Sequence, residues 1–315
     1  MRYKYIKEYK PILLNVRTRL EYIQAKQNIQ EYVYNSLVEK MSICCEKSRL
    51  AKCKNCGAEH HKETTYCNQR LCPVCAKRKS LKYVAILSDI FMNLMKRNYI
   101  CMLTFTISDS ENLKENMNNL EKSWRYMVHD CKFTRFGFKK LIAGGIRSFE
   151  TKLGENSKKW HSHYHCIIIK SKFCKDFEIL KAYWKYATKY ITGKEGSIDI
   201  RSIKLRNDKT TTQINNYESL IKAINETVKY ITKFNFSDYT DKQVIELVNE
   251  TYKKRFTNGF GILSKYQKDF AKADELNEDE AVKMICRNCK CTEFDIEEVL
   301  TDSIPEDVLE FEREI

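Results

Sequence analysis

The stretch Trp160–Lys170 reads W-H-S-H-Y-H-C-I-I-I-K, and its composition predicts a β-strand. Alternate side chains of a strand share a face, so His161, His163 and His165 are expected to point the same way, about 6.8 Å apart in succession. Three of the six histidines in the chain lie here. Neutral imidazole is a common metal ligand, so the pattern indicates a metal-binding strand, with a half-buried strand carrying incidental histidines as the alternative.

A second strand is expected at 141–151, joined to the histidine strand by a polar loop, so the two are predicted to form a hairpin. If Thr151 pairs near Trp160, Glu150 falls opposite His161 on the histidine face. In that register the Glu150 carboxylate is a candidate third metal ligand, and a carboxylate at the rim of the sheet is the alternative.

Charge is distributed unevenly along the 315 residues. The formal net charge is +14, but residues 274–315 carry 15 acidic and 4 basic side chains, which leaves residues 1–273 strongly basic. A strongly basic body favours nucleic acid as partner. The chain shows neither a secretory signal nor an apolar run long enough for a membrane span, so we expect a cytoplasmic protein without a membrane partner.

Cysteines occur in two closely spaced pairs. Cys53 and Cys56 form C-K-N-C, and after fifteen intervening residues Cys72 and Cys75 form C-P-V-C. This spacing predicts a structural Zn²⁺ site of four thiolates, closed to substrate, in which Cys67 could replace one of the four.

Three further cysteines, Cys286, Cys289 and Cys291, lie in the acidic segment after Asp274. They make half a zinc site at most, and the interpretation favoured from the sequence is a mobile tail with incidental thiols.

Local patterns predict an alternation of helices and strands. The helices are expected at 17–45, 76–96, 108–130, 173–190 and 217–234, and the strands at 99–107, 141–151, 160–170 and 197–204. The corresponding domains are an N-terminal helical segment, a cysteine-rich zinc-binding segment with its helix, a catalytic domain and an acidic C-terminal tail, at residues 1–50, 51–97, 98–270 and 271–315.

The last of these helices contains E-T-V-K-Y-I-T-K. Its spacing places Glu226, Tyr230 and Lys233 on one face. A tyrosine at helical spacing usually belongs to a hydrophobic core. This motif alone therefore does not indicate catalysis, and it does so only together with the other motifs of the chain.

Three ordered blocks together resemble the rolling-circle replication initiators of bacterial plasmids, which belong to the HUH endonuclease superfamily. They are L-T-F-T at 103–106, W-H-S-H-Y-H at 160–165, and Glu226-x3-Tyr230-x2-Lys233. The cysteine segment 67–78 and the block 254–265 are also similar to that family. Ser162 stands where the family usually has proline. This difference removes no metal ligand.

The resemblance implies an α+β fold of ferredoxin or RRM type: a central antiparallel sheet with flanking helices, the histidine strand central and the tyrosine helix alongside. It implies a metal-dependent nickase that cuts one strand of plasmid origin DNA, single-stranded at the nick, with Tyr230 as nucleophile. His163 and His165 would hold Mg²⁺ or Mn²⁺, with Glu150 or His161 as third ligand, although imidazole also suits zinc or nickel.

In similar initiators a glutamate near the tyrosine activates water or another nucleophile for the closing cleavage, which Glu226 would do here, while Lys233 would offset negative charge. A host helicase and polymerase are implied partners. The alternatives are a transposase or relaxase of the same superfamily, or a non-catalytic zinc-dependent DNA-binding regulator. The regulator leaves the histidine strand unexplained.

Overall fold

The chain forms two compact units, each assembled from separate parts of the sequence. The computed structural model describes residues 4–29, 31–95, 99–130, 138–170, 177–202, 212–228, 236–274, 284–304 and 308. We call the first unit the cysteine unit (Met1–Arg78, Ile231–Tyr252 and Glu275–Ile315) and the second the histidine unit (Lys79–Tyr230 and Lys253–Asp274). The sequence predicts four domains in linear order, whereas each unit combines segments that are distant in the chain.

The described helices are α1 (Lys4–Gln27), α2 (Tyr32–Ser42), α3 (Pro73–Met95), α4 (Leu113–Arg125), α5 (Phe138–Leu141), α6 (Phe177–Thr192), α7 (Thr212–Thr227), α8 (Asp241–Thr251) and α9 (Gln267–Asp274). Short helical turns are η1 (Tyr126–Asp130), η3 (Phe236–Asp238), η4 (Ser264–Tyr266) and η5 (Thr301–Ser303). The strands are β1 (Lys47–Cys53), β2 (Glu59–Thr64), β3 (Tyr99–Thr106), β4 (Gly144–Leu153), β5 (Trp160–Lys170), β6 (Ser197–Ser202), β7 (Thr257–Gly261) and β8 (Phe294–Leu300).

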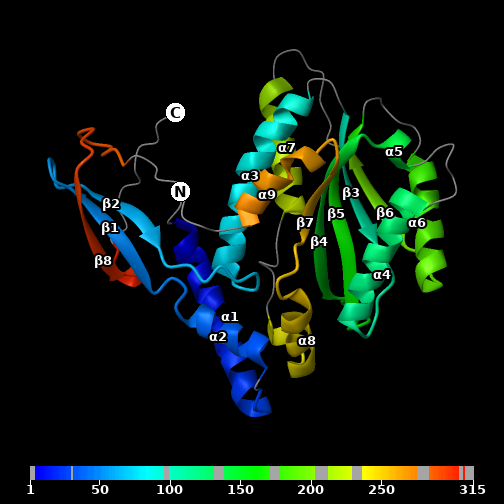
Figure 1. The fold of residues 1–315 in the computed structure, drawn as a ribbon, viewed down its shortest axis with the longest axis horizontal. Helices are drawn as coiled ribbons and strands as arrows, with labels where there is room; N and C mark the ends of the chain where they lie inside the picture. Colours follow the sequence, from blue (N-terminus) through cyan, green and yellow to red (C-terminus); the bar gives the residue numbers. More distant parts are fainter. Residues whose placement is uncertain are drawn as a thin grey trace. The chain divides into compact units, whose positions relative to one another are not determined.

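The histidine unit is built on a five-stranded antiparallel sheet in the order β6-β3-β5-β4-β7 (Figure 1). β5, which carries the histidines, is the central strand, and ten of its eleven residues are buried. A strand covered on both faces reads as a continuous apolar run, which explains the I-I-I at its end. The predicted α+β class with a central histidine strand is therefore confirmed.

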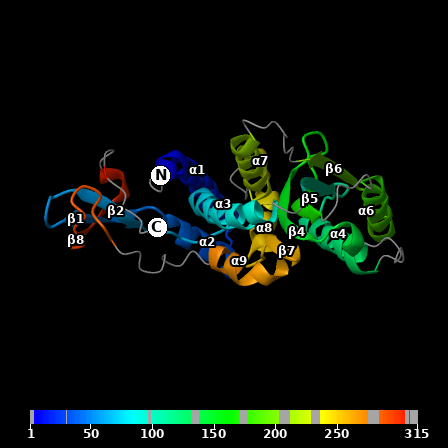
Figure 2. The ribbon, with the colours of Figure 1, turned by 90° about the horizontal axis from the view of Figure 1, so that it is seen from above.

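One face of this sheet is covered by α4 and α6, as Figures 1 and 2 show. Its core is aromatic: Phe105 of β3 makes edge contacts with Trp124 of α4 and Trp184 of α6, at 5.3 and 5.2 Å between ring centroids. Tyr164 of β5 also packs against Trp124. Because side chains alternate along β5, the neighbours of Tyr164, His163 and His165, lie on the other face, the side on which the two views place α7.

The carboxylate of Glu121 is held next to this aromatic layer. Glu121 of α4 accepts hydrogen bonds from both terminal nitrogens of Arg147, at 2.8 and 3.2 Å, and from the Tyr164 hydroxyl at 2.7 Å. Arg147 also lies over the rings of Trp124 and Tyr164. The contacts tie α4 to β4 and β5 and so fix the pairing of the two strands.

The cysteine unit contains a three-stranded antiparallel sheet in the order β2-β1-β8. β8 pairs with β1 along all seven of its residues, so the segment treated as a tail in the sequence analysis includes a sheet strand. In the helical part of this unit Arg19 donates to Asp241, the first residue of α8, at 2.6 Å.

Two local predictions were wrong. The helix expected at 108–130 begins instead at Leu113. The Asn112 side chain caps it by accepting a hydrogen bond from the Glu115 amide, while Ser110 bridges to Trp160 in the sheet. The long helix expected at 17–45 is divided between α1 and α2. Among the described helices we find none that is both long and apolar enough to span a membrane.

We expect Glu121→Gln to reduce the free energy of unfolding by about 1–3 kcal/mol, because it removes the charge that faces a buried guanidinium. Burial alone would raise the pKa of Glu121, but Arg147 and Tyr164 outweigh it and hold the pKa below its usual range. Its contribution is therefore present above the unfolded-state pKa and is lost as pH falls through the folded-state value.

Urea unfolding at pH 7 and at pH 4 measures this change. The difference between wild type and variant should shrink at the lower pH, and the exposed loop substitution Glu155→Gln should leave stability unchanged at both. Equal stability of wild type and Glu121→Gln at pH 7 would contradict the structural role of the ion pair.

Candidate metal centres and active site

The pairing of β4 with β5 brings a carboxylate to the histidines. Glu150 lies directly opposite His163, and Thr151 opposite Ser162. The register expected from the sequence, with Thr151 near Trp160 and Glu150 opposite His161, is wrong by two residues. A shift of two preserves which face each side chain occupies, so Glu150 still reaches the histidine face.

Glu150, His163 and His165 form a compact group of three potential metal ligands. The two Nε2 atoms of the histidines are 3.0 Å apart, and Glu150 Oε2 lies 2.9 Å from His165 Nε2 and 3.7 Å from His163 Nε2. These separations allow one ion to contact all three atoms. Two imidazoles and one carboxylate are a donor set that divalent ions of the first transition row, including Mn²⁺, accept.

The surroundings keep these groups in a ligand-competent state. His165 is oriented by a hydrogen bond of 3.1 Å between its Nδ1 and the Thr104 hydroxyl on β3, which leaves Nε2 directed at Glu150. Burial lowers the pKa of His163, so its ring is neutral near pH 7. Burial opposes ionisation of Glu150, but the two histidines outweigh it and hold the pKa of the carboxyl well below its usual range.

His161 has a different partner. Its Nδ1 lies 2.7 Å from Asp109 Oδ1, and Asp109 also accepts a hydrogen bond from Ser157. Of the two contenders for the third ligand position, Glu150 is therefore the one that the structure brings to His163 and His165. The aspartate was not recognised from the sequence, because it lies 52 residues away from His161.

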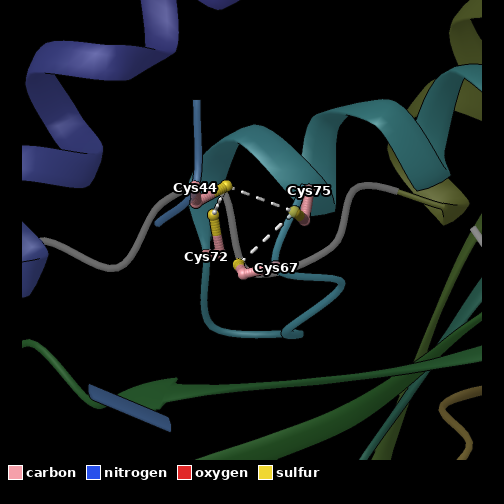
Figure 3. Close-up of side chains that lie close together, drawn as sticks. All are labelled: Cys44, Cys67, Cys72 and Cys75. Atoms are coloured by element: carbon pink, nitrogen blue, oxygen red, sulfur yellow. Dashed lines mark hydrogen bonds between the residues drawn. The ribbon is translucent and has the colours of Figure 1, made fainter. Parts of the chain in front are cut away.

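Four buried cysteines, Cys44, Cys67, Cys72 and Cys75, gather where α3 begins (Figure 3). Their closest sulfur atoms lie 3.6–3.7 Å apart. Four thiolates around one zinc at about 2.3 Å would lie about 3.8 Å apart, so the cluster fits a tetrahedral ion. Pro73 follows Cys72 and begins α3, the helix position at which proline is favoured.

A second group consists of Cys53, Cys56, Cys286 and Cys289. The structure thus separates the two cysteine pairs that the sequence analysis assigned to one site: Cys53 and Cys56 lie with cysteines of the C-terminal segment. The reason is that β1 pairs with β8, which brings residues more than 230 positions apart to the same end of the sheet. Sequence spacing describes only the loop between two pairs and carries no information on this pairing.

The tyrosine helix is described in part. α7 contains Glu226, which is half-buried, and packs against β5. Tyr230 and Lys233 lie outside the described residues, so the spatial relation of the expected nucleophile to the histidines stays a prediction.

Comparison with known proteins identifies the protein family of this chain. Residues 58–300 match the model of the replication protein family. This chain belongs to that family. The resemblance to plasmid replication initiators that the motifs indicated is thereby confirmed. No solved structure matches the chain.

Its relatives share the name protein rep. The one from Streptococcus pneumoniae serotype 2 (strain D39 / NCTC 7466) is 26% identical over 249 residues, which cover 74% of this chain and 72% of that protein. The one from Lactiplantibacillus plantarum is 26% identical over 243 residues, covering 70% and 72% respectively. The residues matched by the family model, 58–300, span the positions of all the candidate ligands except Cys44, Cys53 and Cys56.

One of the missed pairings has a detectable signal in the sequence. Cys286 and Cys289 repeat the C-x2-C spacing of Cys53 and Cys56, and no other C-x2-C pair lies near them in the chain. Cys44 has no such signal, since it belongs to no C-x2-C pair and lies 23 residues before Cys67.

We expect Glu150→Gln to weaken Mn²⁺ binding by about tenfold or more, because it replaces the anionic oxygen of the ligand group by a neutral amide. Calorimetric titration of Mn²⁺ into the protein at pH 7 measures the affinity. His161→Ala is the matched control, as it removes a neighbouring imidazole that is bound to Asp109, and should leave the affinity unchanged. The reverse ranking of the two variants would assign the third position to His161.

Proposed function

We propose that this replication protein is a metal-dependent nickase that cleaves one strand of plasmid origin DNA through Tyr230 and remains attached to the 5′ phosphate, so starting rolling-circle replication. The observation that supports this most directly is the convergence of Glu150, His163 and His165 on a buried face of the central strand. In a replication protein such a group fits a role in phosphoryl transfer.

The reaction requires a nucleophile that becomes covalently bonded to the phosphate and so conserves the energy of the broken phosphodiester bond. The Tyr230 oxygen attacks the scissile phosphorus, the bond to the 3′ oxygen breaks, and the phenol proton is transferred as the 3′ hydroxyl forms. A phenol with an ordinary pKa near 10 is about one part in a thousand ionised at pH 7, which corresponds to roughly 4 kcal/mol. A divalent ion, when bound, polarises the phosphate and stabilises its developing negative charge.

The chain's own residues supply the remaining steps. Glu150 and the two histidines would hold the ion, and Thr104 keeps the His165 ring in position. On α7 and the residues that follow it, Lys233 would offset charge near Tyr230, and Glu226 would act as general base for the cleavage that ends replication. Both roles rest on the motif that these residues share with similar initiators.

The buried group of Cys44, Cys67, Cys72 and Cys75 would hold a structural Zn²⁺. The four sulfur atoms lie within 4.8 Å of one another, and a closed tetrahedral site of four thiolates would leave no position for substrate. The ion would fix the beginning of α3, the helix that continues from the cysteine unit into the histidine unit.

The proposed partner is origin DNA, single-stranded at the nick, with a host helicase and polymerase acting afterwards. The strongly basic residues 1–273 suit a polyanion. Membership of the replication protein family favours this function over a transposase or relaxase. A non-catalytic zinc-dependent regulator would not need the ligand group on β5.

We expect a covalent protein–DNA adduct when the protein is incubated with single-stranded origin oligonucleotides and Mn²⁺. The adduct should disappear with a chelator and in Tyr230→Phe, which lacks the attacking oxygen. A denaturing gel with 3′-labelled and 5′-labelled strands identifies which fragment carries the protein, and the 5′-phosphate fragment is expected.

Tyr217→Phe, at another tyrosine of the same sequence segment, is the matched control and should form the adduct normally. An undiminished adduct in Tyr230→Phe would overturn the assignment of the nucleophile. Binding without cleavage of any origin strand would favour the regulator.

Cys72→Ser should impair folding rather than chemistry, because it opens the buried cysteine group. We expect loss of zinc and a lower thermal midpoint, with the Mn²⁺ requirement of the residual cleavage unchanged. A variant that stays folded with full zinc but loses cleavage would show that this group has a catalytic role.

A further inference from the structure

We propose that Cys53, Cys56, Cys286 and Cys289 form a second structural zinc site, distinct from the buried cysteine group, which fastens the C-terminal strand β8 to β1. This site does not depend on the nicking activity. It assigns a role to the C-terminal C-x2-C pair.

The distances indicate one ion. Cys53 Sγ lies 3.4 Å from Cys289 Sγ, and Cys56 Sγ lies 3.5 Å from Cys286 Sγ, and all four sulfur atoms lie within 4.8 Å of one another. The sulfurs are too far apart for disulfides, which need about 2.05 Å. An iron–sulfur cluster distributes its thiolates over several irons, whereas four sulfurs around one point suit a single soft ion, for which zinc is the common choice.

The two C-x2-C turns have the same backbone. The Cys53 amide donates to the Ala58 carbonyl, and the Gly57 amide donates back to the Cys53 carbonyl. In the other turn the Cys286 amide donates to the Cys291 carbonyl, and the Lys290 amide donates to the Cys286 carbonyl. Two turns of identical pattern thus present their paired thiols to each other.

Both turns place their fifth residue in the left-handed region. Gly57 has φ 71° and Lys290 has φ 62°. Glycine adopts this conformation readily, but for lysine it carries a cost. Lys290 nevertheless adopts this conformation, in the turn that directs Cys286 and Cys289 toward Cys53 and Cys56. Such a conformation is expected where a bound ion stabilises the turn.

Apart from its ladder with β1, little apolar burial holds β8 in place. Ile296 and Leu300 are exposed, 46% and 65% accessible, whereas Phe294 and Val299 are half-buried. The ion pairs Lys47–Glu298 and Lys54–Asp295 are exposed on both sides, and such pairs contribute little. A small sheet with so little apolar burial needs a cross-link, and a structural metal supplies one.

The position of the site gives it a specific consequence. The ion would join residues of the N-terminal part of the chain to residues near its end, whose separations in sequence are 236 and 230 positions. A cross-link over a loop of that length restricts the unfolded chain strongly. Loss of the ion should therefore release residues 284–304 before the rest of the protein unfolds.

Exposure distinguishes this site from the buried cysteine group. Cys56 is exposed and Cys289 is partly exposed, whereas all four members of the buried group are inaccessible. A chelator or a thiol reagent should therefore remove this ion first.

The test uses full-length protein loaded with Zn²⁺ and analysed by metal quantification after gel filtration. We expect Cys289→Ser to lose one zinc per chain relative to wild type, and amide hydrogen exchange to show lost protection in β8 with the histidine sheet unchanged. Cys291→Ser is the matched control, since Cys291 lies two residues away and outside the group, and it should retain all zinc and the protection of β8.

A second measurement does not depend on how the variant folds. Wild-type protein loaded with Co²⁺ should show tetrahedral thiolate bands whose loss on chelation has two phases, the faster one accompanied by exchange in β8. Full zinc content in Cys289→Ser, equal loss in Cys291→Ser, iron in place of zinc, or single-phase Co²⁺ release would each overturn the proposal.

Discussion

The antiparallel pairing of β4 with β5 is the constraint on which the candidate active site depends. It sets Glu150 opposite His163, and the alternation of side chains then places His165 beside both. A slip of one residue would carry Glu150 to the opposite face of the sheet and leave the two histidines without their carboxylate. The ligand group is thus a property of strand register rather than of any flexible loop.

The opposite face of the same sheet secures that register. Tyr164 stands between the two histidines in sequence and points into the aromatic layer formed with Trp124. Glu121 binds both Arg147 of β4 and Tyr164 of β5, so one carboxylate of α4 holds the two strands together. Packing on one face of the central strand therefore positions the polar groups on the other face. The residues that stabilise the sheet and the candidate metal ligands thus lie on opposite faces.

The cysteine unit is organised differently. Its three-stranded sheet has an exposed outer strand, and its elements come from both ends of the chain. One of its two groups of four thiols joins distant segments, Cys53 and Cys56 with Cys286 and Cys289. In such a small assembly, the metal ions proposed for the two groups would replace part of the apolar burial that stabilises the histidine unit.

The sequence by itself determined the features that have a local period or a fixed motif. These are the histidine strand at Trp160–Lys170, the shared face of its histidines, the α+β class and the resemblance to replication initiators. It also brought Glu150 to the correct face despite a register wrong by two residues, because face depends only on whether a shift is even or odd.

Only the tertiary structure decided which groups meet. In the structure His161 contacts Asp109 rather than the metal-ligand group of Glu150. The pairs Cys53/Cys56 and Cys72/Cys75 belong to separate cysteine groups. The acidic C-terminal segment supplies β8, which pairs with β1. Each of these pairings joins residues far apart in the chain. Local spacing cannot specify such contacts, since they depend on how strands and helices pack after they form.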